Sequence, residues 1–240
     1  MKRSGAMLLV VIILTGLLAG CDLSEVIVSG SGDVVTQEED ISGFDEVSAS
    51  HNFDVNIEQG DSYEVVIRID DNLLDDLEVT KRGDRLEIGF KRNIITRNAT
   101  MEADITMPRL RGVDLSGASD AHITGFDSND DFSSGLSGAS SLSGDIRSGD
   151  VSLDLSGASE VTLSGSGGNL VIDASGSSDV DLAEFPVEDA DLDLSGSSEI
   201  ILNVNGTLDV SASGSSDVEY VGEPTLGSIQ TSGSSSVSRR

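Results

Sequence analysis

Short runs in which apolar and polar residues alternate cover most of the chain. Two examples are residues 151–155 (Val-Ser-Leu-Asp-Leu) and residues 161–163 (Val-Thr-Leu). Alternation with a period of two is typical of a β-strand with one buried face, so we expect Val, Leu and Ile to point inward and Ser, Asp and Thr to point outward. The pattern therefore predicts an all-β protein built from many short strands.

The phrase Ser-Gly-x-Ser recurs seven times between these runs, and its copies begin at Ser116, Ser137, Ser156, Ser175, Ser195, Ser213 and Ser232. The copies are 21, 19, 19, 20, 18 and 19 residues apart, and a fixed period of this length is typical of a solenoid. Glycine in every second position predicts a corner whose backbone conformation a side chain would penalise. The repeat therefore predicts a parallel β-helix with about 19–20 residues per coil in the C-terminal half.

Stacked coils would place equivalent residues above one another at the strand spacing of about 4.8 Å. The predicted column of corner glycines consists of Gly117, Gly138, Gly157, Gly176, Gly196, Gly214 and Gly233. A serine column flanks it on each side. Because hydroxyl groups both donate and accept hydrogen bonds, we interpret these serines as structural.

Two further columns are rich in carboxylates. The column that follows the corner contains Asp120, Ser141, Glu160, Asp179, Glu199, Asp217 and Ser236, and the column before it contains Asp114, Gly135, Asp154, Asp173, Asp193, Ser211 and Gln230. Carboxylates are ligands for Ca²⁺, so the candidate metal ligands are Asp120, Glu160, Asp179, Glu199 and Asp217. Serines interrupt the column, and a solvated acidic face or adaptation to high salt are the alternatives. We expect no other cofactor.

The first half of the chain alternates less regularly. Strand patterns begin at Phe44, and a turn at Gly83 joins two alternating runs as a hairpin would. Most of the basic residues lie in this half. We expect residues 21–43 to form a tether with a possible first strand, and residues 44–240 to form the β-helix domain.

Residues 1–20 have the features of a secretory signal. Lys2 and Arg3 precede an apolar run, from Met7 to Leu18, that is too short for a comfortable membrane span. The run ends in Leu-Ala-Gly before Cys21, the only cysteine, and resembles a lipoprotein lipobox. By that resemblance the signal is removed before Cys21, and Cys21 receives lipid that anchors the chain to a membrane.

An ordered set of features resembles one bacterial family. These are Gly-Phe-Asp-Glu-Val at residues 43–47, the strands at 53–57 and 86–88, Met-Pro-x-Leu at 107–110, and the Ser-Gly repeats. Together they are similar to the head GIN domain of auto-transporter adhesins, a family of unknown function, over residues 31–238. The resemblance implies a right-handed parallel β-helix outside the cytoplasm, often on a lipoprotein, and supplies no catalytic residues.

The net charge of −29 weighs against DNA, RNA or anionic lipid headgroups as partners, since these require basic patches. Between residues 113 and 238 there is one Arg, no Lys, one His and no Trp, so the groups that a polysaccharide-active enzyme needs are scarce. His51 and His122 lack the spacing of a metal site, and we interpret both as strand or turn residues.

These observations favour a non-enzymatic, lipid-anchored module of the cell envelope, for adhesion, scaffolding or interaction with an envelope protein or glycan. A polysaccharide-active β-helix enzyme and a calcium-dependent binding module are the alternatives. The strand edges at the solenoid ends also leave self-association open.

Overall fold

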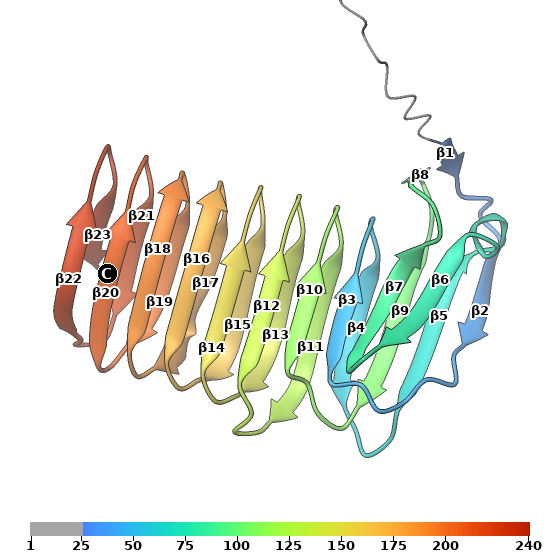
Figure 1. Cartoon of the computed structure of the whole chain (residues 1–240), viewed down its shortest axis with the longest axis horizontal. Helices are drawn as coiled ribbons and strands as arrows, with labels where there is room; N and C mark the ends of the chain where they lie inside the picture. The colour runs from blue at the N-terminus through green and yellow to red at the C-terminus, as the bar shows by residue number, and fades with distance from the viewer. Residues whose placement is uncertain (1–25) are drawn as a thin grey trace, which may run out of the picture.

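The computed structural model describes residues 26–240, and it is the all-β solenoid that the repeat predicts. Two large sheets face one another, and from residue 101 onward successive strands alternate between them (Figure 1). A single turn of 3-10 helix, Asp71–Leu73, lies at the N-terminal end. Among the described residues, no helix has the length and apolar character needed to cross a membrane.

The first sheet has ten strands. Its spatial order is β22 (Thr225–Thr231), β20 (Thr207–Ala212), β18 (Ala190–Gly196), β16 (Leu170–Gly176), β14 (Val151–Leu155), β12 (Phe132–Leu136), β10 (Gly112–Leu115), β3 (Glu46–Ala49), β7 (Arg85–Phe90) and β6 (Leu77–Arg82). Every pair from β22 to β7 is parallel, and only β6 pairs antiparallel with its neighbour.

The second sheet has eleven strands. Its spatial order is β2 (Val34–Glu38), β5 (Glu64–Asp70), β9 (Met101–Met107), β4 (Asp54–Gln59), β11 (Asp120–Asp127), β13 (Ser141–Arg147), β15 (Glu160–Ser166), β17 (Asp179–Val187), β19 (Glu199–Val204), β21 (Asp217–Val221) and β23 (Ser236–Arg239). A separate small sheet pairs β1 (Val26–Ser29) with β8 (Ile94–Arg97).

The core lies between the two large sheets and is mainly aliphatic. In β14 the residues alternate between buried and exposed, and Val151, Leu153 and Leu155 are each at most 2% exposed. Phe44, Phe53, Phe132 and Phe185 are the largest of the fully buried side chains. Burying each such side chain contributes roughly 1.5–3 kcal/mol, so the repeated inward positions supply most of the driving force for stacking.

The N-terminal end departs from parallel winding, as the irregular pattern there predicts. β6 and β7 form an antiparallel hairpin with Gly83 at a φ of 64°, so the hairpin prediction is confirmed. β2 pairs antiparallel with β5, which in turn pairs antiparallel with β9. Residues 21–43, predicted as a tether with a possible first strand, contain both β1 and β2, and β2 belongs to the second sheet.

Candidate functional site

The seven corner glycines lie one above the next along the solenoid. Each has a φ between 75° and 99°, in the left-handed region that favours glycine. The N–H of Ala158 donates to the carbonyl of Gly138, and the N–H of Ser177 donates to the carbonyl of Gly157, both at 2.7 Å. A Cβ on Gly157 would collide with the carbonyl oxygen of Gly138. Both the φ angle and the close approach of the next coil therefore require glycine here.

The two serine columns form different hydrogen bonds. In five of the seven copies the second serine is buried and donates to the carbonyl of the first, as Ser159 Oγ does to Ser156 at 2.8 Å. In four copies the first serine donates to a carbonyl of the preceding coil, as Ser156 Oγ does to Leu136 at 3.4 Å. These bonds explain why serine recurs at both positions: its hydroxyl satisfies a carbonyl where the chain turns.

An eighth corner precedes the seven, although it lacks the Ser-Gly-x-Ser phrase. The N–H of Ala118 donates to the carbonyl of His51, so His51 occupies the glycine position with a φ of 77°. Its ring contacts Phe90 edge-on at a centroid distance of 5.0 Å, and its Nδ1 lies 2.9 Å from Ser50 Oγ. Burial lowers the pKa of the His51 ring, and a hydrogen bond with the backbone of Ser50 opposes this shift without cancelling it.

The predicted acidic column is in register and extends further than the repeat indicates. Strand pairing places Asp120, Ser141, Glu160, Asp179, Glu199, Asp217 and Ser236 in succession. Beyond Asp120 the column continues through Asp54 and then Glu102, from two strands outside the repeat. Burial, followed by the charges of Asp120 and Glu102, raises the pKa of Asp54.

Where serines interrupt this column, they replace a carboxylate and donate a hydrogen bond to the neighbouring one. Ser141 Oγ donates to Asp120, and Ser236 Oγ donates to Asp217 at 2.6 Å. Within residues 26–240 no group of three or more His, Cys, Asp or Glu side chains is placed to hold a metal ion. The five candidate ligands thus form a line along the solenoid rather than a cluster, and calcium binding stays a prediction.

Other carboxylates connect neighbouring coils through backbone groups. Asp150 Oδ1 accepts from the N–H of Asn169 at 2.8 Å, and Asp114 Oδ1 accepts from Gly135 at 3.0 Å. Similar bonds from the next coil are accepted by Asp131, Asp189 and Asp209. Hydrogen bonds to a charged acceptor are stronger than neutral ones, so part of the acidic charge stabilises the stack. Of these residues only Asp114 belongs to a column predicted from the sequence, because no repeated phrase marks the other four.

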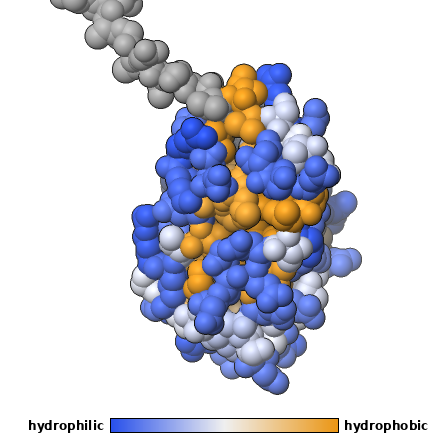
Figure 2. All heavy atoms as spheres, turned by 90° about the vertical axis from the view of Figure 1, so that its right-hand side faces the viewer, coloured by the Kyte–Doolittle hydropathy of each residue, from blue (hydrophilic) through white to orange (hydrophobic). Residues whose placement is uncertain are grey.

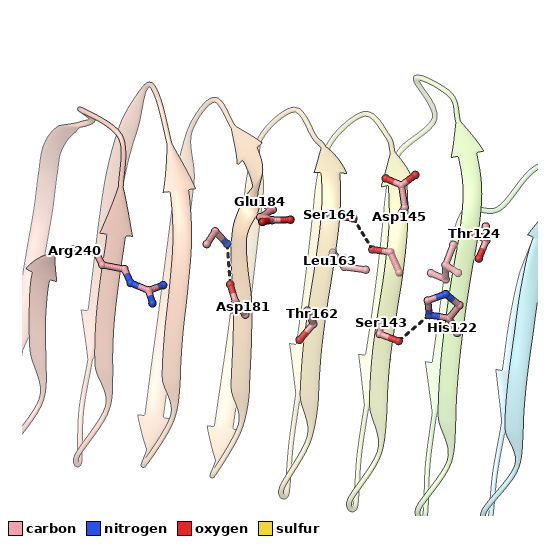
Figure 3. Close-up of a pocket in the computed structure, with 13 residues that line it drawn as sticks. His122, Thr124, Ser143, Asp145, Thr162, Leu163, Ser164, Asp181, Glu184 and Arg240 are labelled. Carbon is pink, nitrogen blue, oxygen red and sulfur yellow. Dashed lines mark hydrogen bonds between the residues drawn. The ribbon is translucent and has the colours of Figure 1, made fainter.

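A groove of about 640 Å³ crosses the outer face of the second sheet (Figure 3). β13 and β15 contribute small residues to it, including Ser143, Gly144 and Ser164. On either side, the pairing register shifts in β11 after Ile123 and in β17 after Leu182. Such irregularities bend a strand locally, and here they occur in the two strands that flank β13 and β15.

Polar side chains line this groove. His122 Nδ1 lies 3.0 Å from Ser143 Oγ, and Ser164 Oγ donates to the carbonyl of Gly144 at 3.2 Å. Carboxylates come from Asp145, Asp181 and Glu184, and Arg240 lies at one end, 3.7 Å from Glu219. None of these residues except His122 was singled out from the sequence, since neighbouring strands bring them together from different coils.

Cys21, the predicted lipidation site, lies outside the described residues. The family model described as "Putative auto-transporter adhesin, head GIN domain" matches residues 43–224, which is most of the chain. The chain belongs to this family. This confirms the resemblance seen in its corner phrase and first-half strands. A search of curated proteins finds no match.

Several solved structures share the fold of this chain. A protein from Bacteroides fragilis described as "a putative adhesin" superposes with a TM-score of 0.81 at 19% identity, covering 88% of this chain and 99% of that one. A "putative lipid binding protein" from Parabacteroides distasonis has a TM-score of 0.72 at 19% identity, covering 89% and 99%. A "putative adhesin" from Parabacteroides merdae has 0.64 at 15%, covering 89% and 99%. At these identities the likeness concerns the fold alone.

Proposed function

We propose that this chain is a non-enzymatic adhesion module of the cell envelope, anchored to a membrane by lipid on Cys21 and exposed outside the cytoplasm. The observation that carries the proposal is the groove over β11, β13, β15 and β17, which presents hydroxyl and carboxylate groups on an uninterrupted stack of coils. Membership of a family described as adhesins supports it.

The stack suits a surface that binds without changing shape. Each coil hydrogen-bonds to the next through strand pairing, corner glycines and aspartate side chains, as in the bonds from Ser177 to Gly157 and from Asn169 to Asp150. A ligand-binding surface built on such a scaffold is already organised before binding, which reduces the entropy cost of association.

The groove's chemistry favours a glycan or a polar segment of an envelope protein. Ser143, Thr162 and Ser164 offer hydroxyl groups, while Asp145 and Asp181 offer carboxylates that accept hydrogen bonds from sugar hydroxyls or amines. The surrounding negative charge opposes nucleic acids and other polyanions.

Filling the groove tests the proposal. Thr162 is exposed at its centre, and Thr162→Arg would occupy the space and add positive charge. Ser211→Arg, at an exposed position on the other sheet, is the matched control. We expect Thr162→Arg to abolish retention of glycans on an array, or of envelope proteins from extracts, while Ser211→Arg leaves it unchanged. Equal retention by both variants would contradict a ligand in the groove.

The contact between His122 and Ser143 favours one second candidate, a polysaccharide-active enzyme. It brings a base within hydrogen-bond reach of a hydroxyl, although among the described residues no carboxylate hydrogen-bonds to the ring of His122. Release of reducing ends from acidic or neutral glycans, lost in Ser143→Ala, would establish this activity and replace the adhesion proposal.

Lipid anchoring has its own test. We expect the wild-type chain to fractionate with membranes and its N-terminal peptide to carry acyl chains by mass spectrometry. The N-terminal peptide of Cys21→Ala should carry no acyl chain, because it lacks the thiol that receives lipid. A wild-type N-terminal peptide without acyl chains would contradict the anchor.

A further inference from the structure

Exposed apolar side chains gather at the N-terminal end of the solenoid. Among the described residues, five large apolar side chains are exposed, and three of them lie at this end: Ile27 at 54%, Val34 at 47% and Ile95 at 39%. The other two, Val171 and Leu226, lie on separate coils. Figure 2, which views this end directly, shows apolar surface extending over the end face.

The arrangement of edge strands explains this patch. β2 and β6 are the last strands of the two sheets at this end, so the coil they belong to is not covered by another. Val35 on β2, Val79 on β6 and Leu74 after the 3-10 helix are consequently only partly buried against the core. We call Ile27, Val35, Leu74, Val79 and Ile95 the apolar end face; Val34, next to Val35 in β2, points to the other side of that strand.

The predicted lipidation site, Cys21, is close in sequence to the first strand at this end of the solenoid. Only four residues separate Cys21 from Val26, where β1 begins. Even fully extended, this segment spans about 18 Å between the two residues. A lipid on Cys21 would therefore hold β1 close to the membrane surface, whereas β22 and β23 lie at the opposite end of the solenoid (Figure 1).

We propose that the apolar end face rests on the bilayer that holds the Cys21 lipid, so that the solenoid projects away from the membrane. The inference rests on the lipid anchoring proposed above. The anchor raises the local concentration of the end face at the bilayer, so weak apolar contacts suffice to orient the domain. The net charge of −29 opposes anionic headgroups, so the contact depends on apolar side chains rather than on charge.

A cysteine scan on the lipidated, full chain tests this orientation. Lipid consumes the thiol of Cys21, the only cysteine, so an introduced cysteine is the single site for an environment-sensitive fluorophore. Ile27→Cys and Ile95→Cys probe the end face, and Leu226→Cys, at a similarly exposed position on β22, is the control. The chain is reconstituted into phosphatidylcholine vesicles with and without nitroxide-labelled lipid.

We expect fluorophores at residues 27 and 95 to emit at shorter wavelength on vesicles and to lose at least half their intensity to the nitroxide lipid. The fluorophore at residue 226 should behave as in water. If all three behave as in water, the docking proposal is overturned.

A shift at residues 27 and 95 without nitroxide quenching would indicate that a second copy covers the end face, which also overturns docking. Mass spectrometry of the N-terminal peptide separates this proposal from the one it rests on. A lipidated chain with water-exposed labels contradicts the docking alone, whereas a chain without lipid contradicts the anchoring itself.

Discussion

The carboxylate of Asp70 accepts hydrogen bonds from the backbone N–H of Gly32 at 2.6 Å and from that of Thr100 at 2.7 Å. Asp70 ends β5 and is 1% exposed. The hydroxyl of Ser31 lies 3.3 Å from it and donates to the neighbouring Asp71 at 2.6 Å. One buried side chain therefore joins the segment before β2, the end of β5 and the segment before β9, and it organises the antiparallel end of the solenoid.

Removing this carboxylate should loosen that end. Asp70→Ala removes the charged acceptor that the N–H groups of Gly32 and Thr100 share, and we expect it to lower the free energy of unfolding by about 3 kcal/mol. Asp71→Ala provides the control, since it removes a single exposed hydrogen bond from the Ser31 hydroxyl and should cost less than about 1 kcal/mol. Urea unfolding measures both, and hydrogen exchange at residues 32 and 100 locates the effect. Similar costs for the two variants would show that Asp70 has no special role.

Glycine is required at the corners for two reasons, the positive φ angle and the close approach of the neighbouring coil, and two substitutions can measure them separately. Gly157 and Gly125 have φ values of 83° and 80°, but only at Gly157 would a Cβ collide with backbone, because nothing lies within 4 Å of a Cβ on Gly125. Gly125→Ala should therefore cost about 1–2 kcal/mol from its φ angle alone. Gly157→Ala should cost at least twice as much in urea unfolding, and an equal cost would mean that the coils can move apart freely.

Neutralising Asp54 should stabilise the fold at neutral pH. Its pKa is raised in the folded state by burial and by Asp120 and Glu102, so the folded protein binds this proton more tightly than the unfolded chain. The resulting stability is present below the ordinary pKa of 3.8 and is lost as pH rises through the folded-state pKa. Asp54→Asn should raise the melting temperature at pH 7, with a smaller gain below pH 4.

Salt provides a check on that explanation. Because sodium chloride screens repulsion along the column, it should raise the melting temperature of the wild type more than that of Asp54→Asn. Asp61→Asn, an exposed acid in the turn after β4, should match the wild type. An Asp54→Asn protein that melts below the wild type at pH 7 would show that Asp54 stabilises the column.

His51 should make stability depend on pH in the opposite sense. Burial lowers its pKa, so the folded state favours the neutral ring. Its contribution is complete above the ordinary pKa of 6.5 and decreases as pH falls through the interval down to the folded-state pKa. Asparagine tolerates the left-handed conformation and does not titrate, so His51→Asn should show a smaller loss of melting temperature between pH 7.5 and pH 5. Equal losses in both proteins would exclude His51 as the cause.

The seven glycine corners were predictable because a positive φ restricts residue choice and so appears directly in the sequence. The corner at His51 was not, since histidine replaces the glycine and Phe53 takes the place of the buried serine. The hydrogen bond from Ala118 to His51, together with the strand pairings on either side of it, reveals that this segment turns in the same column.

The acidic column was also predictable from the sequence only in part. Its course from Asp120 to Ser236 comes from a period of about nineteen residues, which sets the register of parallel coils. Its continuation through Asp54 and Glu102 requires the pairing of β11 with β4 and of β4 with β9. These strands are not successive in the chain, and a local pattern carries no information about which of them become neighbours.

Alternation and spacing alone thus determined the strands, the corners and the acidic outer surface, because each depends on residues close together in the chain. The groove at His122 and Ser143, the buried role of Asp70 and the apolar end face depended on the tertiary structure. Register shifts and antiparallel end strands arise from contacts between segments that are distant in the chain, and those contacts leave no periodic signal in the sequence. The same contacts decide which coil is the last of the stack and so remains uncovered.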